Sequence, residues 1–396
     1  MLSFTTYSPT EIIFGAGAEV RTSDLVKKYG GTKVLVVYGE GSVVKSGLLD
    51  KITSQLDESG ISYMKYGGVM PNPHLSYARA GVQVAIEYGA DFILAIGGGS
   101  AIDAAKAIAH GTKNPDMDIW KYWSREEIVT QSLPIGVVLT ISAAGSETSW
   151  SAVLTNTETG QKRGLSTDFN RPAFAILNPE LTYTLPPYQI ACGIADIMMH
   201  TLDRYFTPEN IHANEITDEI AEAVLRTVIK NGVIALADPT NYHAQSELMW
   251  CGSLSHNGVT GLGRSHDFTV HQLGHELSGK FDVAHGASLT TVWCEWARYN
   301  LHVNPQRFAQ LATKVWGVPH IADYTVTAKA GIDATENFFK SIKMPTNFTE
   351  LGIGIQPDDV VEQLAFRCVH EGKRRVGIFN PLDKEDVMAI YKAVNM

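Results

Sequence analysis

The sequence predicts two domains of different fold class: an α/β domain with a parallel sheet at residues 1–187, and an all-helical domain at residues 188–396. Two observations carry this prediction. Short apolar runs alternate with helical stretches in the first half, and two of these runs lead into glycine-rich turns, whereas helical periodicity dominates after Leu185-Pro186-Pro187. A chain of 396 residues is long enough for two domains that each bury a core.

The apolar runs of the first half predict buried strands. They lie at residues 33–38, 92–96, 135–139 and 174–177 and alternate with helical stretches, a pattern typical of βα units. In an open parallel sheet, ligands bind beyond the carboxyl ends of the strands. We therefore expect a ligand site where these runs end.

Three consecutive glycines, Gly97, Gly98 and Gly99, separate the run 92–96 from an alanine-rich helical segment. The amides of such a strand, turn and helix can approach a phosphate closely. Ser100 and Asp103 also fit a helix N-cap with its acid at N3, which is an ordinary structural signal. Because three glycines exceed what a cap needs, we predict a phosphate site here.

The run 33–38 also ends in a glycine-containing turn, Gly39-Glu40-Gly41-Ser42. It is not the G-x-G-x-x-G fingerprint, because Val44 stands where the third glycine would be. Taken with the first turn, it supports an open parallel sheet that binds a nucleotide.

Acidic and imidazole side chains in the second half have the spacing of a metal site. Asp196 and His200 are four residues apart, as are His271 and His275, and His285 follows ten residues later. Residues four apart share one face of a helix. Imidazoles and one carboxylate, without thiolates, suit a catalytic Fe²⁺ or Zn²⁺ rather than a closed structural zinc site.

Each of these histidines, taken alone, has an ordinary explanation as a hydrogen-bonded core or surface residue. The clustering argues against that explanation. Five of the thirteen histidines fall in one short stretch, at positions 256, 266, 271, 275 and 285. The ligand subset stays open at this point, because His256 and His266 lie near and Asp282 can replace Asp196 as the carboxylate.

Helical periodicity after residue 187 predicts the second domain. Ile220, Val224 and Val228 form one apolar stripe, and Asn231-Gly232 predicts the end of that helix. Since the metal residues lie in this domain and the glycine turns in the first, we expect the active site in the cleft between them.

Composition limits the classes of partner and compartment. A net charge of −10 argues against nucleic acid. No apolar run approaches the roughly 20 residues of a membrane span, and the N-terminus lacks a basic segment followed by a hydrophobic one. Four scattered cysteines favour a reducing compartment, so we expect a cytoplasmic protein and, by default for this size, a homodimer.

The same motifs also resemble those of a known family. Gly97 to Lys106, Gly145-Ser146-Glu147, Leu185-Pro186-Pro187, Gly193 to His200, and His271 to Gly286 stand in the order seen in iron-containing (group III) alcohol dehydrogenases. The chain resembles their butanol dehydrogenase and NADPH-dependent aldehyde reductase branch over essentially its full length. The glycine motif is shared with glycerol dehydrogenases and dehydroquinate synthases, whereas the combined metal motifs are more specific.

The resemblance implies an architecture like that of dehydroquinate synthase and hydride transfer between NAD(P)H and a small primary alcohol or aldehyde. It implies that the first domain binds the dinucleotide and the second binds the metal and substrate. Asp196, His200, His271 and His285 match the four metal ligands. His275 matches a histidine that faces the substrate, and it is our candidate for passing a proton to solvent; spacing alone equally allows it to shape the pocket or help hold the metal.

The resemblance also implies a set of cofactor-binding positions in the first domain. Ala144 stands where many relatives have threonine, which removes one expected hydrogen bond to the cofactor. The matching positions are Gly39, Ser42, Asn72, Gly97, Gly98, Gly99, Ser100, Asp103, Thr140 and Lys162.

The choice between NAD and NADP depends on the turn after residue 38. Relatives that prefer NAD often carry aspartate in place of Gly39, and its absence leaves room for a 2′-phosphate that Ser42 and Lys45 can bind. Glu40 favours NAD instead, because its carboxylate repels a phosphate. On balance these residues favour NADP slightly.

Other functions remain open at this point. A metal-dependent lyase of the dehydroquinate synthase kind needs several basic groups for its substrate, and the region around the metal motifs is mainly apolar. A glycerol dehydrogenase-like enzyme shares the glycine motif. A non-catalytic metal- or nucleotide-binding protein would not require its two sites to share a cleft.

Overall fold

The computed structural model describes residues 1–39, 41–209 and 214–396, so Glu40 lies outside the described residues. The chain forms two compact units. We call Tyr7–Pro186 with Asp238–Ser253 the sheet unit, and Met1–Thr6, Pro187–Ala237 and Leu254–Met396 the helical unit.

The sheet unit is built on a six-stranded sheet in the order β1-β8-β5-β4-β2-β3, and all neighbouring strands are parallel. A separate antiparallel hairpin, β6 with β7, follows the fifth strand. The predicted parallel α/β fold is therefore confirmed. The strands are β1 (Glu11–Phe14), β2 (Lys33–Tyr38), β3 (Ser62–Tyr66), β4 (Phe92–Gly97), β5 (Ile135–Leu139), β6 (Ser151–Asn156), β7 (Gln161–Ser166) and β8 (Phe174–Leu177).

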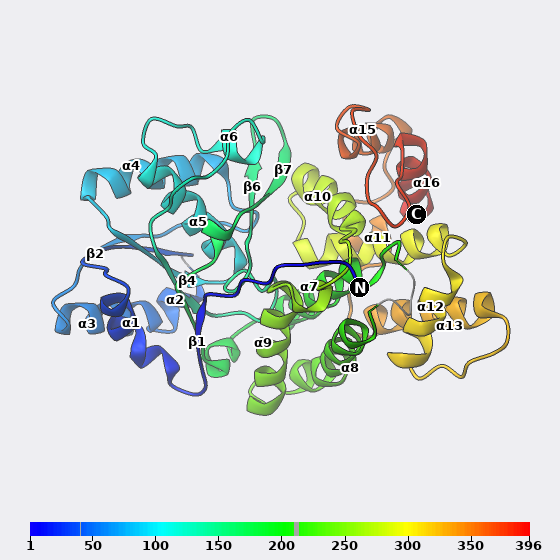
Figure 1. Ribbon diagram of the computed structural model, residues 1–396, viewed down its shortest axis with the longest axis horizontal. Helices are drawn as coiled ribbons and strands as arrows, with labels where there is room; N and C mark the ends of the chain where they lie inside the picture. Colours follow the sequence, from blue (N-terminus) through cyan, green and yellow to red (C-terminus); the bar gives the residue numbers. More distant parts are fainter. Residues whose placement is uncertain (40, 210–213) are drawn as a thin grey trace. The chain divides into compact units, whose positions relative to one another are not determined.

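Helices cover both faces of this sheet (Figure 1). Successive side chains of a strand point to opposite faces, so Val34 and Val36 pack in one apolar cluster with α1 and α3, while Leu35 and Val37 pack in another with α5 and α9. Burial of both faces explains the continuous apolar runs. The helices of this unit are α1 (Thr22–Lys28), α2 (Ser42–Lys45), α3 (Leu48–Glu58), α4 (Leu75–Tyr88), α5 (Gly99–Lys113), α6 (Trp120–Trp123) and α9 (Tyr242–His256), of which the last three residues belong to the helical unit.

The register of the central strands brings three turns to one edge of the sheet. Tyr38 of β2 pairs with Ile96 of β4, and Gly97 pairs with Leu139 of β5. The turns that begin at Gly39, Gly98 and Thr140 consequently leave the sheet side by side.

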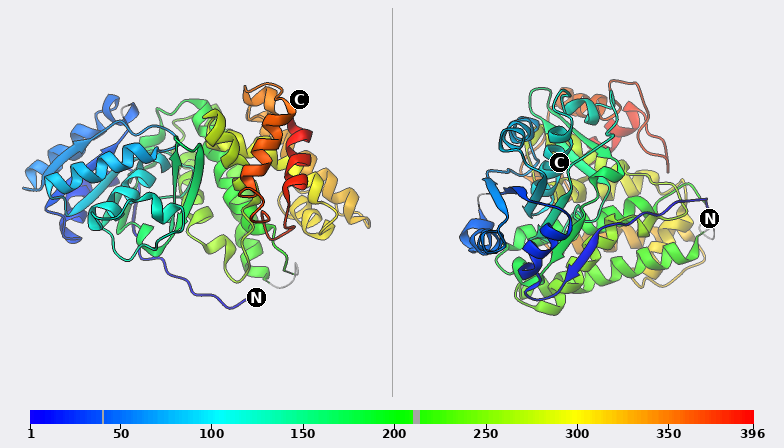
Figure 2. Two further views of the ribbon diagram at one scale, coloured as in Figure 1. Left: turned by 90° about the horizontal axis from the view of Figure 1, so that it is seen from above. Right: turned by 60° about the vertical axis from the view of Figure 1, so that its left-hand side comes forward.

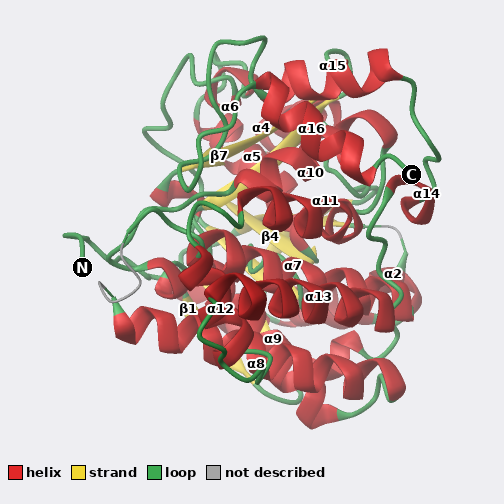
Figure 3. Ribbon diagram, turned by 90° about the vertical axis from the view of Figure 1, so that its right-hand side faces the viewer, coloured by secondary structure: helices red, strands yellow, loops and turns green. Residues whose placement is uncertain are grey.

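The helical unit contains no β-strand within its described residues (Figure 3). Helix α7 packs against α8, α10 and α11, α12 packs against α13, and α15 lies beside the C-terminal α16 (Figure 2). No described helix is long and apolar enough to cross a membrane. The helices are α7 (Pro187–Tyr205), α8 (Glu215–Ala237), α10 (Thr269–Phe281), α11 (His285–Asn300), α12 (Pro305–Lys314), α13 (Tyr324–Ser341), α14 (Phe348–Leu351), α15 (Asp358–Cys368) and α16 (Lys384–Val394).

The predicted helix end at Asn231-Gly232 is wrong, because α8 continues to Ala237. Gly232 lies where α8 crosses α7, and a Cβ atom there would be 2.9 Å from Ile194 Cδ1. The glycine therefore permits close helix packing rather than ending the helix.

Candidate functional site

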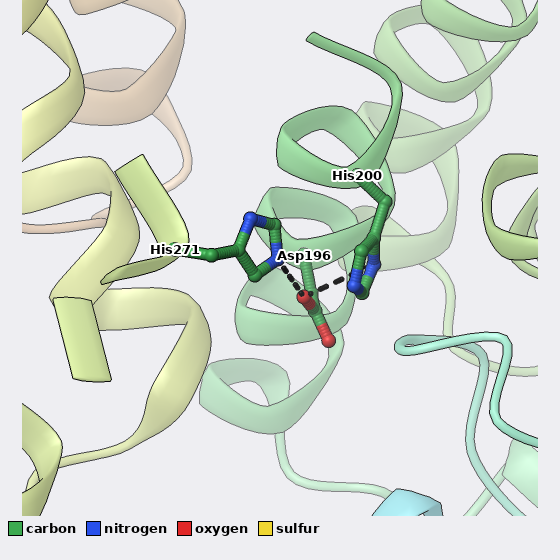
Figure 4. Close-up of side chains that lie close together, drawn as sticks. All are labelled: Asp196, His200 and His271. Carbon is green, nitrogen blue, oxygen red and sulfur yellow. Dashed lines mark ion pairs between the residues drawn. The ribbon is translucent and has the colours of Figure 1, made fainter. Parts of the chain in front are cut away.

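Three helices bring the predicted metal residues together. Helix α7 carries Asp196 and His200, α10 carries His271, and α11 begins at His285. Asp196 Oδ1 lies 3.4 Å from His200 Nδ1, 3.8 Å from His271 Nε2 and 3.8 Å from His285 Nε2. Figure 4 shows the side chains of Asp196, His200 and His271 pointing toward one another.

The donor atoms of this cluster fit a divalent metal. Asp196 Oδ1, His200 Nδ1 and His271 Nε2 are buried, and none has a hydrogen-bond partner among the described residues. Leaving such atoms unsatisfied is costly. Ligands about 2.1 Å from a tetrahedral ion lie about 3.4 Å apart, close to the separations seen here.

Burial also keeps one imidazole neutral. It holds the pKa of His200 well below its usual value, and the neighbouring His256 and His271 lower it further. His271 differs: burial lowers its pKa, but the adjacent carboxylates of Asp196 and Asp203 outweigh burial and raise it. A neutral imidazole is the form that binds a metal.

Asp203 is a residue that the sequence analysis missed. Its Oδ2 is 2.6 Å from Nδ1 of His271 and its side chain is buried. The sequence held a signal for it, since positions 196, 200 and 203 follow the i, i+4, i+7 spacing of one helix face.

The other candidate histidines lie around the cluster. His275 is half-buried, with its ring centroid 5.3 Å from that of His285. His256 stacks on His200 with ring centroids 3.9 Å apart, and its Nδ1 faces Arg204. His266 Nε2 is 2.9 Å from the carbonyl oxygen of Gly261.

The alternative carboxylate, Asp282, does not lie with the three converging side chains. It is exposed at the C-terminal end of α10, where its φ of 51° is left-handed. The carboxylate that meets the imidazoles is that of Asp196.

The glycine turn of the sheet unit packs closely against the segment after β5. A Cβ atom on Gly98 would be 2.3 Å from Ile141 Cγ2, and one on Gly99 would be 3.3 Å from the Cβ of Ala144. Gly98 is the N-cap of the 15-residue helix α5 and provides no side-chain cap, so the first amides of α5 are not used by a capping side chain. Uncapped amides at the start of a long helix suit a phosphate.

The interpretation of Ser100 and Asp103 as a capping pair is wrong. Helix α5 begins at Gly99, one residue before Ser100. The partly buried carboxylate of Asp103 instead accepts hydrogen bonds from Ser146 Oγ at 2.5 Å and Val153 N at 2.8 Å. Burial raises the pKa of Asp103.

Lys106, one turn further along α5, holds the same loop. Its Nζ donates to Ser146 O, Ser146 Oγ and Ser151 O at 2.7, 2.8 and 2.7 Å. Burial lowers the pKa of this lysine to about 8. Asp103 and Lys106 thus attach the loop after β5 to the helix that begins at the glycine turn.

The remaining predicted cofactor positions fall into three places. Lys162 Nζ donates to Asn72 Oδ1 at 2.8 Å, and Asn72 is buried with a left-handed φ of 54°. The backbone amide of Thr140 donates to the carbonyl of Gly97 at 3.1 Å. Gly39 directly follows the strand β2, and Ser42 starts α2 as an exposed residue.

Comparison with known proteins identifies the family. Residues 9–179 match the family of iron-containing alcohol dehydrogenases, and residues 190–395 match the C-terminal region of Fe-containing alcohol dehydrogenases. The chain belongs to the iron-containing alcohol dehydrogenase family. As a member it is an oxidoreductase of the alcohol dehydrogenase and aldehyde reductase class, and membership implies a metal and a nicotinamide cofactor.

Relatives of this iron-containing alcohol dehydrogenase align over most of its length. NADH-dependent butanol dehydrogenase A of Clostridium acetobutylicum is 38% identical over 393 residues, which cover 99% of each chain. NADPH-dependent aldehyde reductase YqhD of Escherichia coli is 34% identical over 89% of this chain and 90% of its own. The crystal structure of NADH-dependent butanol dehydrogenase A from Thermotoga maritima has a TM-score of 0.95 at 33% identity and covers 100% of this chain and 99% of that one.

Proposed function

We propose that this chain is a metal-dependent, butanol dehydrogenase-like enzyme that interconverts small primary alcohols and aldehydes. The observation that carries the proposal is the convergence of buried donor atoms from Asp196, His200 and His271, with His285 beside them. When bound, Fe²⁺ or Zn²⁺ would act as a Lewis acid and the nicotinamide would carry the hydride. In this proposal the four residues hold the metal.

The protein's own groups then supply binding and proton transfer. His275 would hold and release a proton, which its half-buried position beside His285 supports. The dinucleotide would be held within residues 1–187 and the metal within 188–396. The uncapped amides of α5 would bind the pyrophosphate, together with Gly97, Gly98, Gly99 and Ser100, while Asn72, Thr140 and Lys162 line the cofactor and Asp103 fixes the loop at Ser146.

We propose NADP as the preferred cofactor. Gly39 offers no carboxylate at the end of β2, and Ser42 and Lys45 are exposed on the short helix that follows. A hydroxyl and an ammonium group suit a 2′-phosphate. The relatives include both NADH- and NADPH-dependent enzymes, so both cofactors belong in the test.

The first experiment measures nicotinamide absorbance with butanal, using protein stripped of metal and then reloaded with Fe²⁺ or Zn²⁺. We expect cofactor oxidation only after metal is restored, and a higher kcat/KM with NADPH than with NADH. His200→Gln should remove both metal binding and activity, whereas His302→Gln, at an exposed histidine, should keep both.

Two outcomes would contradict parts of this proposal. Tight metal binding without oxidation of either cofactor would exclude reduction of simple aldehydes and favour a lyase or a binding protein. A higher kcat/KM with NADH than with NADPH would contradict only the proposed preference for NADP and would leave the proposed reaction unchanged.

We also propose that the enzyme is a cytoplasmic homodimer. The four free thiols suit a reducing compartment. Light scattering should give twice the chain mass of 43.2 kDa, and a single-chain mass would refute the dimer.

A further inference from the structure

Asp203 determines which nitrogen of His271 carries the proton. Its buried carboxylate accepts from His271 Nδ1 at 2.6 Å and from the backbone amide of the same residue at 3.2 Å. A carboxylate offers only acceptor oxygens, so Nδ1 is the protonated nitrogen. In the neutral imidazole, the form that binds a metal, Nε2 of His271 therefore presents its lone pair toward Asp196 Oδ1, 3.8 Å away.

Arg204, the next residue of α7, imposes the opposite arrangement on His256. Its Nη2 lies 2.8 Å from His256 Nδ1. A guanidinium has no acceptor, so it must donate, and His256 carries its proton on Nε2. Arg204 is fixed in this position by hydrogen bonds from Nη1 to the carbonyl oxygens of His200 and Ser255, at 2.8 and 3.1 Å.

Without this constraint, His256 would be a credible metal ligand. Its ring stacks on that of His200 with centroids 3.9 Å apart, closer than the 4.4 Å between His200 and His271. Proximity alone does not separate the two imidazoles. The tautomeric state distinguishes them, because a metal binds only a ring nitrogen whose lone pair is not already used by another group.

We propose that Asp203 and Arg204 select the metal-binding imidazoles by fixing His271 and His256 in opposite tautomers. His271 is kept ready to bind the metal through Nε2. His256 is kept out of the ligand set, because its Nδ1 is occupied by Arg204 and its Nε2 is protonated. Both selecting residues act through the imidazoles, so they are positioning residues, and the inference rests on the metal site of the proposed function.

The first test is the zinc affinity of Asp203→Asn, measured by competition with a chromophoric chelator. Asparagine keeps the size of the side chain but can turn its amide N–H toward His271 Nδ1, which favours the wrong tautomer. We expect the Kd for Zn²⁺ to rise about 10- to 100-fold, the range for loss of such a partner.

Asp267→Asn is the matched control. Asp267 is also buried in the helical unit, but Oδ1 accepts from the backbone amides of Ile378 and Phe379 rather than from an imidazole. We expect it to lower the unfolding temperature and to keep the wild-type zinc affinity. The inference would be overturned if Asp203→Asn kept the wild-type affinity for Zn²⁺, or if both variants lost the same amount of zinc affinity.

A second test reads the tautomers directly and does not depend on the stability of Asp203→Asn. Two-bond ¹H–¹⁵N spectra of zinc-loaded protein labelled at histidine should show the proton of His271 on Nδ1 and that of His256 on Nε2. His271→Gln and His256→Gln assign the signals. A proton on Nδ1 of His256 would overturn the selection by Arg204, whereas failure of wild-type protein to bind zinc would refute the proposed function itself.

Discussion

At the scale of single residues, His110 shows how burial controls protonation in the sheet unit. The imidazole is fully buried, with Nε2 2.8 Å from Asn170 Oδ1 and Nδ1 2.9 Å from Ser132 Oγ. Asn170 donates its amide hydrogens to the carbonyl oxygens of Trp150 and Leu165, so its oxygen faces His110 and Nε2 carries the proton. Burial lowers the pKa of His110 to about 4.

This depressed pKa predicts a loss of stability in acid. The unfolded chain binds a proton at His110 below about pH 6.5, whereas the folded chain binds it only below about pH 4, so acid favours unfolding over that interval. The contribution lost is about 3 kcal/mol. In urea unfolding at several pH values, His110→Gln, which cannot titrate, should lose less free energy of unfolding than wild type between pH 6.5 and 4. Equal losses in the two proteins would show that His110 does not titrate as its burial implies.

Residue identities and spacing were sufficient to predict which side chains would come together, because carboxylate and imidazole chemistry is local to the side chain; that they bind a metal stays a prediction. Asp196, His200 and His271 stand out in the sequence by residue type and spacing, and the structure brings their donor atoms together. Asp203 and Arg204 do not stand out in this way, because their roles depend on which imidazole each one faces. That information comes from the packing of α7 against α10 and from the hydrogen bonds of Arg204 to Ser255 and His256, which sequence spacing does not contain.

At the scale of elements, α7 and α11 approach each other at Gly286. A Cβ atom there would lie 2.2 Å from the backbone oxygen of Cys192, which cannot rotate away. Asp196 lies one turn beyond Cys192, and His285 precedes Gly286. The helix spacing at this contact therefore sets the separation of two proposed metal ligands.

Gly286→Ala should push α7 and α11 apart. Overpacking of this kind costs about 1–3 kcal/mol, and the displaced ligands should also weaken zinc binding. Denaturant unfolding and chelator competition measure the two effects. Gly164→Ala is the control, because the nearest atom to its Cβ is 4.0 Å away and its free energy of unfolding should change by about 0.5 kcal/mol or less. Unchanged stability and zinc affinity in Gly286→Ala would contradict the proposed role of this contact.

The helices and strands that can be predicted from the sequence are those in which a single pattern of apolar and polar residues dominates. The runs 33–38, 135–139 and 174–177 became β2, β5 and β8, because burial on both faces requires apolar residues at every position. The β6–β7 hairpin was missed, since Gln161–Ser166 is largely polar and only partly buried. The predicted helix end at Gly232 is wrong because the packing of α8 against Ile194 outweighs the low helix propensity of glycine.

At the scale of the whole molecule, apolar periodicity correctly predicted the class of both parts of the chain. It could not predict which element covers each apolar face. Helix α9 follows α8 in sequence, yet its Met249 packs in the sheet-unit cluster with Leu35 and Val137. A buried helix face has the same sequence pattern whichever partner covers it.

Because the proposed metal and cofactor residues lie in different units, we expect the two ligands to slow amide hydrogen exchange in different parts of the chain. A ligand that binds only the folded state stabilises it by about 2.7 kcal/mol at 100 times its Kd, which corresponds to about 100-fold slower exchange through unfolding. Zn²⁺ should slow exchange first in α7 and at the starts of α10 and α11, where its proposed ligands lie. NADPH should slow it first in the opening turn of α5 and in residues 140–153, which Asp103 and Lys106 hold to that helix. Zinc-dependent protection confined to the glycine turn, with α7 and α10 unchanged, would contradict the assignment of the metal to the helical unit.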